Sequence, residues 1–144
     1  HYKPVESYHA EGAETLFLTM GSIGETVSVA VDELRAEGKS VGQLSLRLWR
    51  PFPFEEFRQA AAGAKRIIVL DRAVSMGGQG GPVATEIRSV LYKEKNMPVV
   101  TNFLCGFAGR DVTVEDYKAM FEKATKMSKR RVREEDYIIY GVRE

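Results

Sequence analysis

The residues best suited to chemistry gather in one stretch, residues 66–82, which reads RIIVLDRAVSMGGQGGP. Residues 67–70 form a short apolar run that predicts a strand buried on both faces, and a helical pattern begins at Pro82. Four glycines lie between the strand and the helix: Gly77, Gly78, Gly80 and Gly81. Free backbone amides at the start of a helix can hold an anion, so this turn is a candidate phosphate site. It matches no nucleotide-binding motif, and a tight turn that binds nothing is the more frequent alternative.

Charged and polar residues follow three predicted strands at the point where each strand ends. The carboxyl ends of parallel strands share one edge of a sheet, where ligands bind and partner domains can dock. The candidates for a phosphate or docking site at this edge are Arg50, Arg72, Ser75, Gly77, Gly80, Gly81 and Arg110. Asp71 and Asp111 could serve as acid and base, but each stands beside an arginine, which favours structural pairing.

The sequence predicts no catalytic residue and no metal site. Ser75 lacks an internal histidine as a base, since His1 and His9 both lie near the beginning of the chain. Cys105 is the single cysteine, and one thiol cannot form an internal disulfide or build an iron–sulfur or zinc site alone. A docking or binding edge is therefore favoured over a complete reaction centre.

Composition and charge narrow the range of partners and compartments. The chain has 144 residues and a formal net charge of +1, which gives no reason to expect nucleic acid or an anionic membrane surface. No apolar run approaches the ~20 residues that cross a bilayer. A single cysteine agrees with a reducing compartment, so a cytoplasmic protein is expected.

Strands and helices alternate along the chain, which predicts a three-layer α/β/α sandwich with a mostly parallel sheet. The predicted strands are residues 15–20, 41–49, 67–70 and 99–104. The predicted helices are residues 22–37, 54–62, 82–94 and a fourth that begins after Thr113. Residues 67–70 should be central in the sheet because they are apolar on both sides.

Local signals indicate the ends and the buried faces of these helices. Gly38 should end the first helix, and both Ser22 with Glu25 and Thr113 with Asp116 have the spacing of a capping box. The residues of the second helix that should face the core are Phe54, Phe57 and Ala61.

The chain divides into three segments by composition. Residues 1–13 are polar and broken by a proline and a glycine, which is typical of an incoming linker cut from a longer polypeptide. Residues 14–125 carry the α/β/α domain. Residues 126–144 form a charged tail, in which the YIIY run at 137–140 could add an edge strand or dock on a partner.

Four motifs, taken in order, carry a resemblance to a known family. They are RPFP at residues 50–53, VLDR at 69–72 with Ser75 and Gly77, GP at 81–82, and GFAGRDVT at 106–113. In this order and spacing the chain resembles the C-terminal domain of the alpha subunit of pyruvate:ferredoxin oxidoreductase and related 2-oxoacid:ferredoxin oxidoreductases. The resemblance covers essentially all 144 residues, although the family commonly has a second glycine where Ala108 stands.

The resemblance implies a fold like the C-terminal domain of transketolase, with a sheet of about five strands. It implies a whole enzyme that decarboxylates a 2-oxoacid, pyruvate being favoured, on thiamine diphosphate with Mg. Iron–sulfur clusters would pass the electrons to ferredoxin, and coenzyme A would accept the acyl group. This chain has no thiamine motif and no cysteine cluster, so those cofactors would lie in the preceding domain of the alpha chain and in other subunits. The chain itself would be a structural and assembly domain, inactive when isolated.

Two other functions remain open at this point. The chain could be a stand-alone domain that binds a phosphate-bearing ligand, such as a nucleotide or coenzyme A, through residues 77–81 and the nearby arginines. It could also be the corresponding domain of another thiamine-dependent enzyme. The RPFP and GRDVT motifs favour the ferredoxin-linked family over that last alternative.

Overall fold

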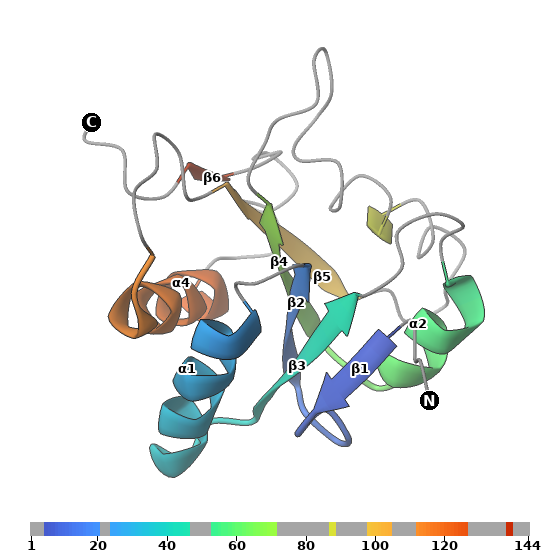
Figure 1. Cartoon of the computed structure of the whole chain (residues 1–144), viewed down its shortest axis with the longest axis horizontal. Coiled ribbons are helices and arrows are strands. Elements are labelled where there is room, and N and C mark those ends of the chain that lie inside the picture. The colour runs from blue at the N-terminus through green and yellow to red at the C-terminus, as the bar shows by residue number, and fades with distance from the viewer. Residues whose placement is uncertain are drawn as a thin grey trace.

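The structure, a computed structural model, describes residues 5–20, 24–46, 53–71, 87–88, 98–104, 112–126 and 138–139. The strands in these ranges are β1 Val5–Tyr8, β2 Thr15–Met20, β3 Val41–Leu46, β4 Arg66–Asp71, β5 Val99–Leu104 and β6 Ile138–Ile139. The helices are α1 Gly24–Ala36, α2 Phe54–Ala60 and α4 Val114–Lys126. Figure 1 shows the sheet between two helical layers, with α1 and α4 on one face and α2 on the other.

The sheet has six strands in the order β1-β3-β2-β4-β5-β6. All neighbouring strands pair in parallel except β1, which runs antiparallel to β3 at one edge. The expected mostly parallel sheet and three-layer α/β/α architecture are confirmed. The strand predicted to be central, β4, lies inside the sheet between β2 and β5.

Strand β4 contributes side chains to both faces of the sheet. Ile67 and Val69 pack in one apolar cluster, together with Phe57 of α2. Ile68 and Leu70 pack in the other cluster, which is built with α1 and α4. Burial of each such side chain stabilises the fold by about 1.5–3 kcal/mol. The uninterrupted apolar run of this strand therefore follows from helices on both faces of the sheet.

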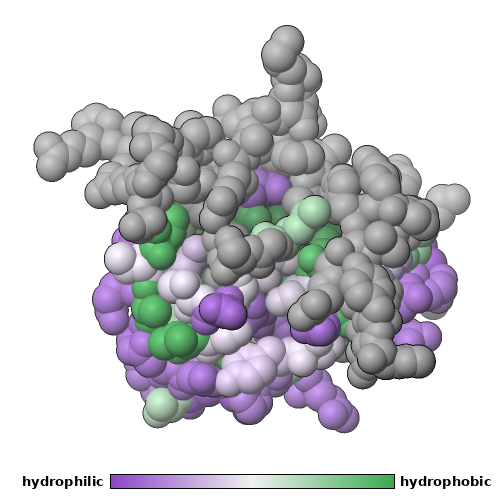
Figure 2. Space-filling view, viewed as in Figure 1, coloured by the Kyte–Doolittle hydropathy of each residue, from purple (hydrophilic) through white to green (hydrophobic). Residues whose placement is uncertain are grey.

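Helix α1 is amphipathic and has the predicted C-terminal cap. Its buried residues are Val27, Ala30, Val31 and Leu34. On the molecular surface, hydrophilic residues prevail toward the bottom of Figure 2, where the amino ends of β2 and β3 lie. Gly38 has a φ of 87° and donates its amide to the Arg35 carbonyl at 3.0 Å, while the Lys39 amide donates to the Leu34 carbonyl. This pair of hydrogen bonds is a Schellman cap, which requires a left-handed residue and favours glycine.

Helix α4 begins with the predicted capping box and forms ion pairs at the C-terminal end of α1. The Thr113 amide donates to Asp116 Oδ2 at 2.8 Å, and the Asp116 amide donates to Thr113 Oγ1 at 3.2 Å. Lys118 of α4 pairs with Glu37 at 2.9 Å and with Glu33 at 3.6 Å. The hydrogen bond to Glu37 raises the pKa of the Lys118 ammonium above its usual value.

Several predicted boundaries shift or lie partly outside the described residues. Helix α2 ends at Ala60 and β3 is described only to Leu46, whereas residues 54–62 and 41–49 were expected. The Ser22–Glu25 capping box and most of the predicted helix at 82–94 lie outside the described residues, of which 87–88 are helical.

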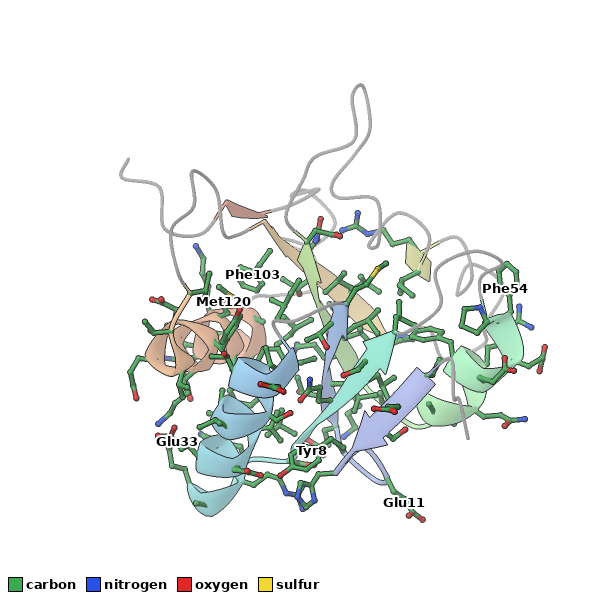
Figure 3. The ribbon with its side chains drawn as sticks, in the orientation of Figure 1. Tyr8, Glu11, Glu33, Phe54, Phe103 and Met120 are labelled. Atoms are coloured by element: carbon green, nitrogen blue, oxygen red, sulfur yellow. The ribbon has the colours of Figure 1, made fainter. Side chains whose placement is uncertain are left out.

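The prediction that Phe54 faces the core is wrong, although it is correct for Phe57 and Ala61. Phe54 is 46% exposed, whereas Phe57 and Ala61 are buried. Phe54 is the first residue of α2, and Figure 3 shows it at the end of the helix that lies farther from the sheet. Helical spacing placed the three residues on one stripe, but only part of that stripe meets the sheet.

The linker interpretation of residues 1–13 does not describe residues 5–8, which form β1. Val5 pairs with Leu46 of β3 and is buried, while the other three residues of β1 are exposed. An edge strand buries few side chains, so its polar composition resembles that of a linker. At the opposite edge of the sheet, residues 138–139 of the YIIY run form β6, parallel to β5. The division of the chain at residues 13 and 125 remains a prediction.

The segment between β1 and β2 is held against the rest of the domain. The Tyr8 phenol donates to Asp32 Oδ1 of α1 at 2.6 Å, and Figure 3 shows Tyr8 near the lower end of α1. His9 has a φ of 52°, and its Nε2 lies 3.9 Å from the same carboxylate oxygen. The His9 carbonyl also lies so close to Gly42 that a Cβ on Gly42 would collide with it.

Replacing Gly42 with alanine should destabilise the protein by roughly 1–3 kcal/mol, the usual penalty of overpacking. The added methyl group would collide with the backbone of His9 and Ala10, which cannot rotate away as a side chain could. Thermal unfolding of Gly42→Ala measures the effect, and Val29→Ala on the exposed side of α1 is the control. A Gly42→Ala variant that unfolds with its parent would show that this close contact is absent.

Tyr8 should ionise at a higher pH than an ordinary tyrosine. The hydrogen bond to Asp32 is the main cause that raises the pKa of the Tyr8 phenol above 10.0. The folded state thus holds this proton more tightly than the unfolded state, so the contribution to stability is complete below pH ~10 and is lost as the pH rises through the raised pKa. Ultraviolet titration of the parent minus that of Tyr8→Phe isolates the group. When the same difference is measured in an Asp32→Ala background, the pKa of the Tyr8 phenol should return to the usual tyrosine range.

Candidate functional site

The carboxyl edge of the sheet is the candidate site, because β2, β3, β4 and β5 all end there. The residues that the sequence proposed for it, Arg50, Arg72, Ser75, Gly77, Gly80, Gly81 and Arg110, lie outside the described residues, as does Asp111. Asp71 is described and is the last residue of β4. That the glycine-rich turn docks a partner rather than binding phosphate therefore remains a prediction.

Asp71 and Asn102 form a buried pair at this edge. Asp71 is 3% exposed and Asn102 is 1% exposed. Asn102 Nδ2 donates to Asp71 Oδ2 at 2.9 Å and to the Val69 carbonyl at 3.2 Å. A buried carboxylate is tolerated only when hydrogen bonds replace its lost water. This pair therefore ties the end of β4 to β5.

Asn102 is a residue that sequence reasoning missed. Asp71 was expected to pair with an arginine such as Arg72 or Arg110, but both lie outside the described residues. Pairing with an arginine therefore remains a prediction. The partner that the structure describes comes from the neighbouring strand, where Asn102 is in register with Val69. The available signal was an asparagine inside the apolar stretch 99–104, since asparagine is depleted in strands.

The neighbouring residue Thr101 differs from Asn102, because its buried polar group has no described hydrogen-bond partner. Its side chain is 2% exposed, and its hydroxyl has no hydrogen-bond partner among the described residues. Side chains alternate along a strand, so Thr101 faces the cluster built with α1 and α4, while Asn102 faces the other. A buried hydroxyl without a partner weakens the fold rather than supporting it.

A second polar cluster holds the beginning of α1 over β2 and β3. Gln43 Nε2 lies 3.0 Å from the Gly24 carbonyl and 3.3 Å from both Thr19 Oγ1 and Ser45 Oγ. Ser28 Oγ lies 2.7 Å from Gln43 Oε1. A Cβ on Gly24 would approach Gln43 Nε2 to 3.3 Å, so a larger residue here would require the Gln43 amide to shift by a few tenths of an ångström. Sequence reasoning missed this cluster, because its members come together only when α1 packs over β2 and β3.

The described residues contain no group of three or more His, Cys, Asp or Glu side chains that could hold a metal ion. Within the same part of the chain, no helix is long and apolar enough to cross a membrane. The buried polar groups at the carboxyl edge contact one another, so they can fix the backbone on which a partner or ligand would rest.

The chain is therefore an α/β/α domain with an open, mostly parallel sheet between two helical layers. A split-gene transketolase, described as an inactive tetramer of four beta chains, has this fold. It has a TM-score of 0.63 and 18% identity over 85% of this chain and 43% of that one. A 2-oxoglutarate:ferredoxin oxidoreductase from Magnetococcus marinus is also similar. It has a TM-score of 0.68 and 25% identity over 87% of this chain and 20% of that one.

Residues 13–117 match the family described as pyruvate:ferredoxin oxidoreductase core domain II, and the chain belongs to this family. Curated relatives include the pyruvate synthase subunit PorA of Methanocaldococcus jannaschii, 37% identical over 85% of this chain and 30% of the relative. The ketoisovalerate oxidoreductase subunit VorA of Pyrococcus furiosus is 42% identical over 85% of this chain and 31% of the relative. The chain thus spans about a third of the length of these relatives.

Exchange of Asn102 for leucine should lower the free energy of unfolding by roughly 1–3 kcal/mol, because the buried Asp71 carboxylate loses a donor. Thr101→Val, in the adjacent position of β5, is the matched control. It removes a hydroxyl that has no described partner and should leave stability unchanged or raise it. Urea unfolding of both variants measures the difference. Equal losses in both variants would contradict the role given to the Asp71–Asn102 pair.

Proposed function

We propose that this chain is the C-terminal structural and assembly domain of the alpha subunit of a 2-oxoacid:ferredoxin oxidoreductase. The observation that carries the proposal is the family match over residues 13–117. In the proposed whole enzyme, pyruvate is oxidatively decarboxylated to acetyl-coenzyme A and the electrons pass to ferredoxin. Because the chain spans about a third of its relatives' length, this reaction belongs to the full-length protein with its other subunits.

Pyruvate is the proposed 2-oxoacid on the strength of relatives rather than of contacts. Relatives named as pyruvate synthase subunits occur in Methanocaldococcus jannaschii and Thermotoga maritima, the latter 39% identical. Relatives named for ketoisovalerate are equally similar. The selection of one acid is assigned to the rest of the enzyme.

The proposed cofactors are held elsewhere in the enzyme. The described residues do not fit Mg with thiamine diphosphate or an iron–sulfur cluster, because they include no group of three potential ligands. The buried carboxylate nearest the carboxyl edge, Asp71, already accepts a hydrogen bond from Asn102. Thiamine diphosphate, Mg, the clusters and coenzyme A are therefore assigned to the preceding domain of the alpha chain and to other subunits.

The geometry supports a docking role for the carboxyl edge. Hydrogen bonds among buried groups hold the ends of β4 and β5 and the beginning of α1. A rigid, internally satisfied edge suits contact with another protein surface, whereas a phosphate site needs donors aimed outward. The proposed partners are the preceding domain of the same chain and the other subunits, in the cytoplasm.

The test compares the full-length subunit, co-expressed with its partner subunits, with the 144-residue chain alone. Both are assayed with pyruvate, coenzyme A, thiamine diphosphate and a ferredoxin-type electron acceptor. The complex should turn over, whereas the chain alone should be silent while showing a cooperative thermal transition. Turnover by the chain alone, or a complex that oxidises no 2-oxoacid, would overturn the proposal.

Calorimetry of the chain separates docking from ligand binding. Titration with coenzyme A, ATP or inorganic phosphate should give no dissociation constant tighter than about 1 mM, the weak end of ordinary affinities. Micromolar binding that disappears in Arg72→Ala or Arg110→Ala would instead favour a phosphate-binding domain.

A further inference from the structure

The register of β1 shows from which side the polypeptide reaches the sheet. Val5 is opposite Leu46, the last residue of β3, and Tyr8 is opposite Gln43 near its middle. Leu46 is in turn opposite Met20, the last residue of β2. Strand β1 therefore begins at the carboxyl edge of the sheet and runs toward the amino ends of the parallel strands. The chain reaches the domain at the same edge as the candidate site.

Segment 5–13 is held in this direction by several independent contacts. Its backbone pairs with β3, and the Tyr8 phenol is bonded to Asp32 of α1. Past the strand, the backbone of His9 rests on Gly42, and Ala10 and Ala13 are buried in the core cluster of α2 and β4. A segment with this many contacts is a rigid joint, not a free tether.

Met20 is an exposed apolar side chain at the edge where this joint begins. It is 40% exposed, although the other five residues of β2 are buried. Two strand spacings, about 10 Å in total, separate it from Val5. Residues 1–4 can span at most about 14 Å. Any polypeptide before His1 must therefore end within about that distance of Val5.

We propose that the carboxyl edge around Val5, Met20 and Leu46 is covered by the polypeptide that precedes His1 in the full-length protein. The proposal rests on the proposed function, in which another domain of the same chain comes first. Segment 5–13 acts as the joint that sets the direction of this contact. The occupant follows from the reach of four residues and from relatives about three times as long as this chain.

Photo-crosslinking in the full-length subunit identifies what covers the edge. Benzoylphenylalanine is incorporated in place of Met20 or, as the matched control, in place of the exposed Lys65, which directly precedes β4 at the amino end of the sheet. Mass spectrometry should find crosslinks from position 20 to residues before His1 of the same chain, and none to those residues from position 65. Crosslinks from position 20 only to another subunit or to a second copy, or the same pattern from both positions, would overturn the inference.

Hydrogen exchange in the same full-length subunit tests the joint. Tyr8→Phe should raise the exchange rate of residues 5–10 by about three- to tenfold, the effect of losing one hydrogen bond of ordinary strength. Ser7→Ala, an exposed position on the same strand, is the control and should leave the rate unchanged. Equal exchange in parent and Tyr8→Phe would overturn the role of the joint.

The outcome is distinguishable from that of the proposed function. Crosslinks from position 20 to the preceding sequence, in a complex that oxidises no 2-oxoacid, would refute the function and leave the covered edge in place. Turnover without those crosslinks would support the proposed function and overturn the covered edge.

Discussion

Burial of β4 on both faces is the constraint on which the rest of the structure depends. Its alternate residues enter two separate apolar clusters, one with α2 and the other with α1 and α4. A strand of this kind is stable only if helices cover both sides of the sheet. Parallel pairing with β2 and β5 follows, because helices return the chain to the same end of the sheet after each strand.

The same two-sided burial explains why polar groups in the sheet are paired so closely. Asn102 and Gln43 lie where helices cover the strands, so water cannot replace the hydrogen bonds that they need. Each is used to hold two elements together: Asn102 joins β5 to the end of β4, and Gln43 joins β3 to the beginning of α1. Hydrogen bonds thus fix the end of β4 against β5 and the beginning of α1 against β3.

Family membership agrees with this architecture and extends what it explains. The ordered motifs at residues 50–53, 69–72, 81–82 and 106–113 indicated the family from the sequence, and the match over residues 13–117 confirms it. The motif at 81–82 lies wholly outside the described residues, which otherwise hold only Pro53 of the first motif, residues 69–71 of the second and residues 112–113 of the last. The observed geometry therefore concerns the scaffold beneath the motifs, in which β4 and β5 end in a buried, bonded pair.

Sequence alone determined the features that depend on neighbours along the chain. The Gly38 cap, the Thr113–Asp116 box and the position of β4 inside the sheet each follow from residues a few positions apart. Tertiary structure decided the rest, because the partners come from distant segments. Val5–Tyr8 is a strand only because β3 is available to pair with it, and Phe54 is exposed because α2 extends past the sheet. Asn102 meets Asp71 because two parallel strands are in register, and a contact of that kind leaves no periodic trace in the sequence.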